Sequence, residues 1–302
     1  MIVLEHFKSD LFLPSPLHEI KWHEDHPPIL FKRDDLIHPI ISGNKWRKLE
    51  GFLESFYRTR KSEINTIGSA FSNHIHSVAY LCFRLNIPCN IIVSGFHGDE
   101  LNDTLNDCIK WRAQLKFLDR KEATQLKLQD QLHHKDVLWI PEGGAGSEAT
   151  VGLLKLISEL PQNFDHKNNL IVVPCGTGTT MLTILKNTNE IKIAYIKPVR
   201  SQYLAIDGRY ENRTVDLSEI TPITFGAFHQ ESYELTKKLN EKTGILLDPI
   251  YTGPLFFALL KFLDEKSDWD KIYFLHSGGL QSWRGFNKRY GCHAFWDQEY
   301  FS

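Results

Sequence analysis

Residues 170–180 read LIVVPCGTGTT, an apolar run that turns abruptly into glycines and threonines. Leu170–Val173 is apolar at every position, which predicts a strand buried on both faces, as in a parallel sheet. The glycines let the backbone approach an anion, the threonines add hydroxyl donors, and a helix starting there points its N–H groups at the ligand. The stretch matches neither the P-loop pattern nor G-x-G-x-x-G. It therefore predicts a site for a single phosphate, and the alternative is an ordinary turn capped by a threonine.

Short apolar runs and helical patterns alternate on both sides of this stretch. The expected strands are 64–67, 89–93, 137–140, 170–173, 191–196 and 272–275, and the expected helices are 74–85, 99–118, 119–135, 150–160, 181–185, 231–242 and 254–263. This alternation predicts an α/β protein with parallel sheets. At roughly 150 residues per domain, two lobes are the natural division. Ligands in such folds bind beyond the carboxyl ends of the strands, so the strand-to-helix turns are the places to look for chemistry.

Composition excludes several classes of protein. Hydrophobic residues make up 42% of the 302 residues, enough for a sizeable core, and the net charge of -2 argues against a nucleic-acid binder. No apolar run reaches the ~18 residues that span a bilayer, and the N-terminus has no signal-peptide core. The five cysteines are widely spaced and form no C-x-x-C, so neither a disulfide framework nor a metal site is indicated. We therefore expect a soluble, cytoplasmic protein without a metal.

A cluster of cations stands in SGNKWRKLE at residues 42–50. If a helix begins near Asn44, Lys45 and Lys48 lie on one face of it and can address one ligand. A lysine in a desolvated pocket loses its proton easily and can form a Schiff base with a carbonyl group. The alternative is a solvated, basic helix start.

Three further turns follow apolar runs and are rich in small polar residues. In SAFSNH at 69–74, Asn73 could hold a ring hydroxyl and Ser72 could handle a proton, or either could simply cap the next helix. The other two are LLDPIYTG at 246–253 and LHSGG at 275–279, where Tyr251 could be a core aromatic and Ser277 part of a plain turn. Four such turns in one chain favour a shared ligand site.

Seven segments of the chain carry a family resemblance. They are FKRDD at 31–35, SGNKWRKLE at 42–50, SNH at 72–74, PEGG at 141–144, CGTGTT at 175–180, GILLDPIYTG at 244–253 and HSGG at 276–279. In this order they resemble the pyridoxal-phosphate enzymes of the 1-aminocyclopropane-1-carboxylate (ACC) deaminase and D-cysteine desulfhydrase family. The resemblance implies the tryptophan synthase β-subunit-like fold (fold type II), two-lobed, with open twisted parallel sheets and flanking helices. It also implies a large cofactor-binding domain of residues 1–48 and 150–302, a small α/β domain of residues 49–149 inserted in it, and a homodimer.

The resemblance also implies a role for each matching residue toward pyridoxal 5'-phosphate. Lys45 would be the Schiff-base lysine, and Lys48 would reach the cofactor phosphate. Ser72 and Tyr251 would act on the substrate, and Asn73 would hydrogen-bond the pyridine 3-hydroxyl. The remaining cofactor residues would be Gly176, Thr177, Gly178, Thr179 and Thr180 around the phosphate, and Thr252 or Ser277 near the pyridine nitrogen.

The implied activity is that of a lyase or deaminase acting on a small amino acid, D-cysteine-like or ACC. It would release a 2-oxo acid and ammonia, with sulfide from D-cysteine. Where ACC deaminases carry a glutamate after the motif tyrosine, this chain has Thr252, as in the D-cysteine desulfhydrase branch. A second tyrosine of the family falls at Phe225 here, and Tyr233 could take its place. Thr252 favours a D-cysteine-like substrate over ACC, whereas the missing phenol would affect both ring opening and thiol elimination.

Three other interpretations stay open at this point. The same scaffold could serve a D-serine-type dehydratase or racemase. With Phe225 in place of a phenol, the chain could bind the cofactor without turnover. The third is a nucleotide-binding oxidoreductase built on the turn at 175–180, but the chain lacks both the third glycine and the acidic residue at the end of strand 191–196 that such a site needs.

The aromatic tail at 295–301 could pack on a partner subunit or on its own lobe.

Overall fold

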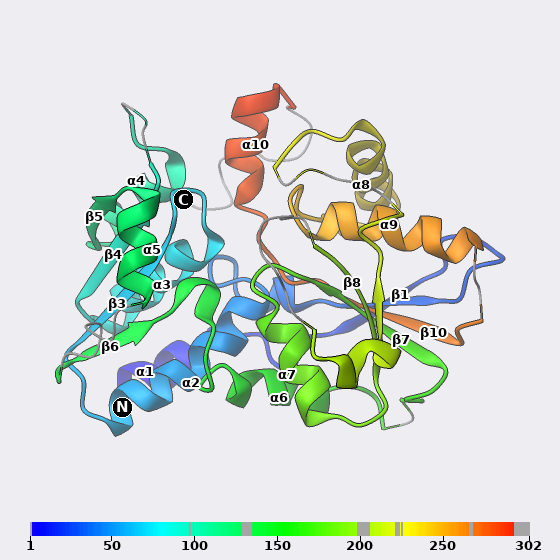
Figure 1. Ribbon diagram of the computed structural model, residues 1–302, viewed down its shortest axis with the longest axis horizontal. Coiled ribbons are helices and arrows are strands. Elements are labelled where there is room, and N and C mark those ends of the chain that lie inside the picture. The colour runs from blue at the N-terminus through cyan, green and yellow to red at the C-terminus, as the bar shows by residue number, and fades with distance from the viewer. Residues whose placement is uncertain are drawn as a thin grey trace.

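The computed structural model describes residues 2–96, 98, 100–128, 135–162, 164–197, 206–220, 224, 226–265 and 268–292, and it contains two sheets (Figure 1). The four-stranded sheet has the order β5-β4-β3-β6, and all its strands are parallel. The six-stranded sheet has the order β1-β2-β10-β7-β8-β9 and is parallel except for β1, which pairs antiparallel with β2. The strands are β1 (Leu17–Ile20), β2 (Ile29–Lys32), β3 (Glu63–Ser69), β4 (Cys89–Ser94), β5 (Gln114–Leu118), β6 (Val137–Ile140), β7 (Asn169–Pro174), β8 (Lys192–Ile196), β9 (Thr214–Asp216) and β10 (Lys271–Leu275).

Helices cover both sheets. Within the described ranges they are α1 (Ile2–Lys8), α2 (Asn44–Arg58), α3 (Asn73–Leu85), α4 (Asp103–Lys110), α5 (Arg120–Leu128), α6 (Thr150–Ser158), α7 (Thr179–Asn187), α8 (Gln230–Thr243), α9 (Thr252–Glu265) and α10 (Ser282–Tyr290). Short 3-10 turns are η1 (Asp34–Leu36), η3 (Glu142–Gly144) and η4 (Gly208–Arg213). None of the described helices is both long and apolar enough to cross a bilayer.

The buried strand predicted at 170–173 lies in the middle of the six-stranded sheet, as part of β7. Leu170 and Val172 pack into the core under α8 and α9, whereas Ile171 and Val173 pack into the core under α6 and α7. These two pairs of helices lie on opposite faces of the sheet (Figure 1). A strand apolar on both sides is needed here because both faces are covered, and the predicted α/β fold with parallel sheets is confirmed.

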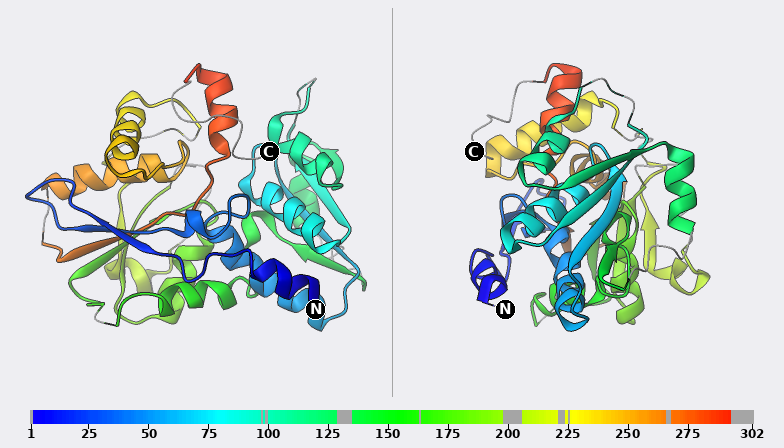
Figure 2. Two further views of the ribbon diagram at one scale, coloured as in Figure 1. Left: turned by 180° about the vertical axis from the view of Figure 1, so that it is seen from behind. Right: turned by 90° about the vertical axis from the view of Figure 1, so that its left-hand side faces the viewer.

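The four-stranded sheet has its own core, to which α1 adds from outside. Phe7 of α1 lies against Trp46 of α2, with ring centroids 5.7 Å apart, and α1 runs beside α2 in the rear view (Figure 2). The strands of this sheet all lie between residues 63 and 140. The domain boundaries at 48/49 and 149/150 stay a prediction.

The single helix predicted over 99–118 is wrong. Helix α4 ends at Lys110, Arg112 takes a left-handed backbone conformation with φ 64°, and the chain continues as strand β5. In β5, Leu115 and Leu118 are partly buried beside exposed neighbours, and the strand pairs with β4. The apolar residues that suggested one long helical stripe therefore belong to two elements, a short helix and an edge strand. The helix predicted over 119–135 is present as α5, and residues 129–134 lie outside the described residues, as do Phe225 and the tail at 295–301.

Candidate active site

The loop before α2 and the loop after β10 meet backbone to backbone. Gly43 has φ 70°, and a Cβ placed on it would overlap the carbonyl oxygen of Ser277. Gly278 has φ 68°, and a Cβ there would overlap Ser42 Oγ. Only glycine combines this close approach with a left-handed conformation. The contact brings the predicted lysine cluster to the end of β10.

Lys45 stands at the start of α2 and faces the turn after β7 through Asn44. Its Nζ donates to Asn44 Oδ1 at 2.7 Å, and Asn44 Nδ2 donates to Thr180 Oγ1 at 3.2 Å. Burial lowers the pKa of Lys45 to about 8, although the Asp248 carboxylate opposes this shift. An amine with this pKa is readily deprotonated near neutral pH, as a nucleophilic lysine requires.

Lys48 lies one helical turn further along α2 and is also buried. Its Nζ donates to the carbonyl oxygen of Gly143 at 3.0 Å, which ties it to the PEGG segment after β6. Burial and the neighbouring charge of Lys45 lower the pKa of Lys48 to about 7, while Cys175 acts in the opposite direction. The two lysines therefore lie close enough for the charge of one to affect the pKa of the other, and both lie beside the turn after β7.

The turn at 175–180 connects β7 to α7. Gly178 caps α7, whose first residue is Thr179, and the Thr177 and Thr179 hydroxyl oxygens lie 2.9 Å apart. Gly176 is exposed, and a Cβ on it would lie 3.6 Å from Cε1 of Tyr251. The turn thus presents two hydroxyl groups and the helix N-terminus beside the Tyr251 ring, which suits a phosphate.

Ser72 and Asn73 open α3 at the end of β3. Ser72 is the helix cap, and its Oγ accepts from the His74 N–H at 3.2 Å. The Asn73 Oδ1 accepts from Gln281 Nε2 at 2.5 Å, and a Cβ on Gly279 would lie 2.6 Å from Asn73 Nδ2. Asn73 therefore lies against the loop that contains Ser277.

Tyr251 and Thr252 stand at the start of α9, around a buried carboxylate. The Thr252 hydroxyl donates to Asp248 Oδ2 at 2.5 Å and accepts from the Asp248 N–H at 2.8 Å. The Tyr251 N–H donates to Asp248 Oδ1 at 2.7 Å. Burial raises the pKa of the Tyr251 phenol, and Asp248 and Glu142 raise it further, so Tyr251 is protonated at neutral pH.

The two residues predicted for the pyridine nitrogen thus differ in their surroundings. Thr252 is completely buried and its hydroxyl belongs to the cap of α9. Ser277 is partly exposed and lies in the loop that Asn73 contacts through Gly279. Tyr233, the possible substitute for the missing tyrosine, packs on α8 against the rings of Phe228 and Trp283.

Sequence reasoning missed three residues that shape the site: Asn44, Asp248 and Gln281. Asp248 carried a usable signal, because Asp-Pro commonly starts a turn and an aspartate side chain there accepts from the backbone N–H groups that follow, as Asp248 does from Ile250 and Tyr251. Asn44 and Gln281 carried none, since their partners Thr180 and Asn73 are far away in the sequence.

Buried charges anchor α2 to the six-stranded sheet. Arg47 donates from Nε and Nη2 to the Asp34 carboxylate, at 2.7 Å each, and from Nη1 and Nη2 to the Glu159 carboxylate, at 2.9 and 2.8 Å. Lys32 Nζ lies 2.6 Å from Glu159 Oε2. Two cations therefore face two carboxylates, so the burial of each charge is compensated. This network includes Lys32 and Asp34 of the FKRDD segment, and it fixes the helix that carries Lys45 and Lys48.

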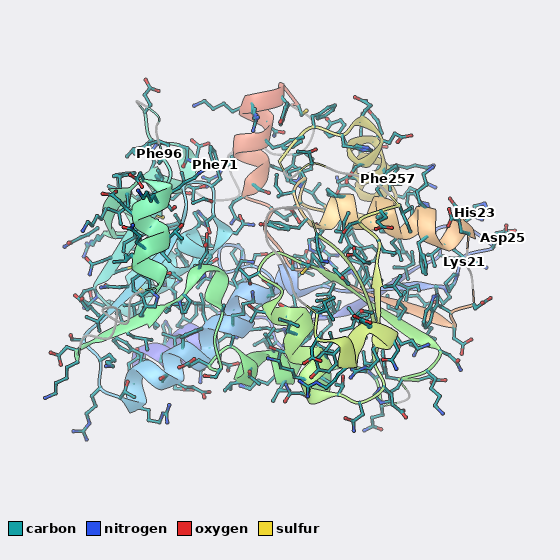
Figure 3. The ribbon with its side chains drawn as sticks, in the orientation of Figure 1. Lys21, His23, Asp25, Phe71, Phe96 and Phe257 are labelled. Atoms are coloured by element: carbon teal, nitrogen blue, oxygen red, sulfur yellow. The ribbon has the colours of Figure 1, made fainter. Side chains whose placement is uncertain are left out.

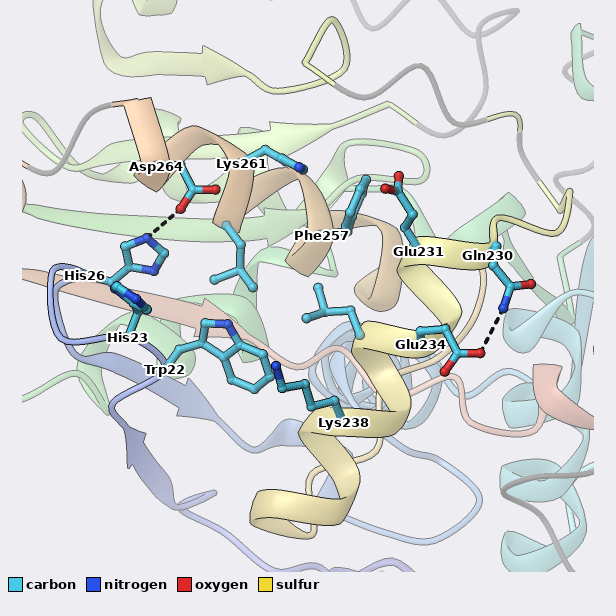
Figure 4. A pocket seen from close by; sticks show the side chains of 12 residues that line it. Trp22, His23, His26, Gln230, Glu231, Glu234, Lys238, Phe257, Lys261 and Asp264 are labelled. Carbon is cyan, nitrogen blue, oxygen red and sulfur yellow. Dashed lines mark hydrogen bonds and ion pairs between the residues drawn. The ribbon is translucent and has the colours of Figure 1, made fainter.

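A groove of about 500 Å³ lies elsewhere, between residues 22–26, α8 and α9 (Figure 4). Its apolar walls are Trp22, Leu235, Phe257 and Leu260. No residue singled out by sequence lines it. Among the described residues, no group of three or more metal-ligating side chains is placed to hold an ion. The candidate active site is therefore defined by the converging turns.

The donor set at these turns fits pyridoxal phosphate. The cofactor carries an aldehyde, a phosphate and a pyridine ring with a hydroxyl group. A buried lysine of lowered pKa suits the aldehyde, the turn at 176–180 with Lys48 suits the phosphate, and the Asn73 amide suits the ring oxygen. The exposed Gly176 leaves backbone open where a larger residue would project.

Comparisons with known proteins agree with this fit. The family model described as "Pyridoxal-phosphate dependent enzyme" matches residues 8–278. A putative ACC deaminase of Pyrococcus horikoshii is 25% identical over 274 residues, covering 83% of this chain and 84% of the relative. The mitochondrial bifunctional D-cysteine desulfhydrase/ACC deaminase of Arabidopsis thaliana is 26% identical over 316 residues, covering 91% and 78%.

Solved structures show the fold. An ACC deaminase homologue superposes with a TM-score of 0.74 at 23% identity, covering 93% of this chain and 94% of that one. A hydrogen sulfide-producing enzyme from Fusobacterium nucleatum gives 0.65 at 16% identity, covering 91% and 96%. The predicted fold type, family and cofactor are confirmed, while the cytoplasmic location and the homodimer stay predictions. The chain belongs to the family of pyridoxal-phosphate dependent enzymes, with ACC deaminases and D-cysteine desulfhydrases among its relatives.

Proposed function

We propose that this enzyme cleaves a small D-cysteine-like amino acid to a 2-oxo acid and ammonia, releasing sulfide from D-cysteine, with ACC a poorer substrate. The observation that carries the proposal is the placement of Lys45, with a pKa near 8, among turns that also hold Ser72, Asn73 and Tyr251. Thr252 in the position of the ACC deaminase glutamate supports the D-cysteine side of the family. The relatives named for D-cysteine desulfhydration are consistent with it.

The binding roles divide between the two sheets. Gly176–Thr180 and Lys48 would hold the phosphate, and Asn73 would donate to the ring oxygen. Ser277 would serve the pyridine nitrogen, and a hydroxyl there would not keep that nitrogen protonated as a carboxylate does. When bound, pyridoxal phosphate supplies an electron sink for the substrate α-carbon.

The proton-handling roles fall to Lys45, Ser72 and Tyr251. Lys45 is a suitable base for the α-proton because its lowered pKa leaves it partly neutral near pH 7–8. Tyr251 keeps its proton at neutral pH and can donate it to the leaving thiolate. Ser72, at the start of α3, lies where it can bind or protonate the substrate.

Product analysis tests the substrate. The cofactor-loaded protein is incubated separately with D-cysteine, D-serine and ACC, and sulfide, pyruvate, 2-oxobutanoate and ammonia are measured. We expect pyruvate, ammonia and sulfide in equal amounts from D-cysteine. Release of 2-oxobutanoate from ACC at a higher kcat/KM would reverse the preference. Faster turnover of D-serine to pyruvate, or its conversion to L-serine, would support the dehydratase or racemase, and no product from any of the three would support a cofactor binder without turnover.

Replacing Tyr251 with phenylalanine should separate turnover from cofactor binding. We expect kcat on D-cysteine to fall by about 10²–10⁴-fold, the range for loss of a general acid. The visible absorption of the bound cofactor should stay. Tyr57→Phe, at the far end of α2 from Lys45, is the matched control and should keep kcat within about two-fold. Equal loss in both variants would contradict the role of Tyr251.

The lysine pKa values predict how anion binding to the cofactor-free protein depends on pH. Lys48 is charged below about pH 7 and neutral above it, so it attracts an anion only on the acid side. Sulfate is a suitable probe because it keeps its charge throughout this range. We expect the stabilisation of the cofactor-free protein by sulfate to decrease as the pH rises through about 7, with a further decrease near 8 from Lys45.

Thermal unfolding at fixed sulfate concentration, scanned over pH, measures this effect. Lys48→Met should remove the part centred near pH 7 and leave the smaller part due to Lys45. Sulfate stabilisation of the wild-type protein that is constant over this range would contradict the assignment of Lys48 to the phosphate.

A further inference from the structure

The start of α10 and the start of α3 face each other across the junction of the two sheets. Gln281, which caps α10, and Arg284 are three residues apart, as are Asn73 and His76 on α3. Residues with this spacing share a helix face. Phe71 lies beside α10 (Figure 3), and a Cβ on Gly285 would be 3.3 Å from its ring. The two helix starts are therefore in direct contact. We call the pair Gln281 and Asn73 the inner level of this contact, and the cluster of Arg284, Asp107 and His76 its outer level.

The inner level joins Gln281 to Asn73. Gln281 is 6% exposed, and its Nε2 donates to Asn73 Oδ1 at 2.5 Å. A side-chain amide has one acceptor atom and one donor atom, which exchange places when the amide rotates by half a turn. In this pairing Gln281 supplies its donor atom to Oδ1, which leaves Nδ2, the donor atom of Asn73, for a ligand. Gly279 leaves room for Nδ2, since a Cβ there would lie 2.6 Å away.

The outer level joins Arg284 to the small-sheet side. Arg284 Nη2 donates to Asp107 Oδ2 at 2.6 Å, and His76 Nε2 lies 2.9 Å from the same oxygen. All three side chains are largely buried, at 15%, 19% and 0% exposure for Arg284, Asp107 and His76. This ion pair holds α10 against α3 and α4 independently of Asn73.

We propose that Gln281 is a positioning residue that locks the Asn73 amide with its N–H toward the cofactor ring oxygen. The inference rests on the proposed contact between Asn73 and that oxygen. An N–H donor stabilises the deprotonated form of the ring oxygen, whereas an amide oxygen in the same place stabilises the protonated form. Gln281 thereby sets both the affinity for the cofactor and the ionisation of its ring, although it comes from the opposite sheet.

Two substitutions at Gln281 give graded outcomes. Gln281→Met keeps the size of the side chain but frees the amide. Gln281→Glu offers only acceptor atoms, so Asn73 must turn Nδ2 toward it and present Oδ1 to the ring. We expect the cofactor-free protein to bind pyridoxal phosphate about ten-fold more weakly in Gln281→Glu, the effect of losing one hydrogen bond to a charged group, and more weakly by a smaller factor in Gln281→Met, whose free amide can still turn Nδ2 to the ring. The visible spectrum of bound cofactor should shift toward the form with a protonated ring oxygen, more in Gln281→Glu than in Gln281→Met.

Arg284→Gln is the matched control, since it breaks the outer level and leaves Gln281 in place. It should lower the unfolding temperature yet keep cofactor affinity within about two-fold and the spectrum unchanged. In an Asn73→Ala background, Gln281→Met should have no further effect on affinity or spectrum.

A spectral shift in Arg284→Gln as large as that in Gln281→Met would overturn the proposal, because the helix contact as a whole would then be responsible. An unchanged spectrum and affinity in Gln281→Glu would overturn it as well. Because these readouts need no substrate, absence of turnover with every amino acid would end the proposed function but not this inference. A wild-type chain that binds no pyridoxal phosphate would end both.

Discussion

Replacing Lys45 with alanine is expected to abolish covalent attachment of the cofactor and to lower kcat by at least about 10³-fold. Lys45 is assigned two functions, as the nucleophile that attaches the cofactor and as the base for the α-proton, and its pKa near 8 suits both. The measurement is the absorption spectrum before and after borohydride, followed by mass spectrometry of the peptide containing residue 45. The wild-type protein should show a visible band, and reduction should fix the cofactor to Lys45.

Lys48→Met is the comparison that separates the two lysines. Lys48 contacts the Gly143 carbonyl and is assigned to the phosphate, so this variant should bind the cofactor more weakly yet still be trapped at Lys45. If borohydride fixed the cofactor at Lys48 in the wild-type protein, the two roles would have to be exchanged. Trapping at neither lysine would remove the basis of the proposed mechanism.

The second large effect is expected for Gly43→Ala. Gly244 has the left-handed helical conformation, φ 70° and ψ 9°, in which an alanine costs about 1–2 kcal/mol, whereas Gly43, with φ 70° and ψ -146°, lies in a backbone region that is essentially restricted to glycine, so an alanine is more strained there. At Gly244 nothing lies within 4 Å of the new Cβ, whereas at Gly43 the Cβ overlaps the Ser277 carbonyl. We expect the free energy of unfolding to fall by about 1–2 kcal/mol in Gly244→Ala and by more than about 4 kcal/mol in Gly43→Ala.

Denaturant unfolding of the two cofactor-free variants measures the difference, and a cofactor titration measures its effect on the site. Gly43→Ala should also lose affinity for pyridoxal phosphate, because the loops bearing Lys45 and Ser277 must separate to admit the methyl group. Equal destabilisation of the two variants would mean that the loops part at little cost.

Local hydrophobic patterns predicted the helices and strands well where the whole pattern belongs to a single helix or strand. The apolar residues of Leu170–Val173 pack on both faces of a sheet, and the glycine-rich turn after them opens α7. The same kind of reasoning failed over 99–118, where leucines of a helix and of an edge strand combine into one apparent stripe. A left-handed residue such as Arg112 is not marked in the sequence, since arginine rarely adopts that conformation.

The site was predictable as a set of turns, but its internal contacts were not. The motifs located Lys45, Asn73, the turn at 176–180 and Tyr251, because each follows a recognisable strand or opens a helix. The hydrogen bond from Gln281 to Asn73 joins the starts of two helices, α10 and α3, which follow strands of different sheets. No local periodicity encodes such a pairing, which only the packing of α10 against α3 creates.

The meeting of Gly43 with Ser277 and of Gly278 with Ser42 gives a rule for sorting related sequences. A lysine aligned with Lys45 is weak grounds for assigning cofactor chemistry, because a lysine can persist on any exposed helix start. A relative with a side chain at either glycine cannot bring the two loops together in this way, whatever stands at position 45. The glycine pair therefore discriminates relatives that preserve this cofactor site from those that preserve the fold alone.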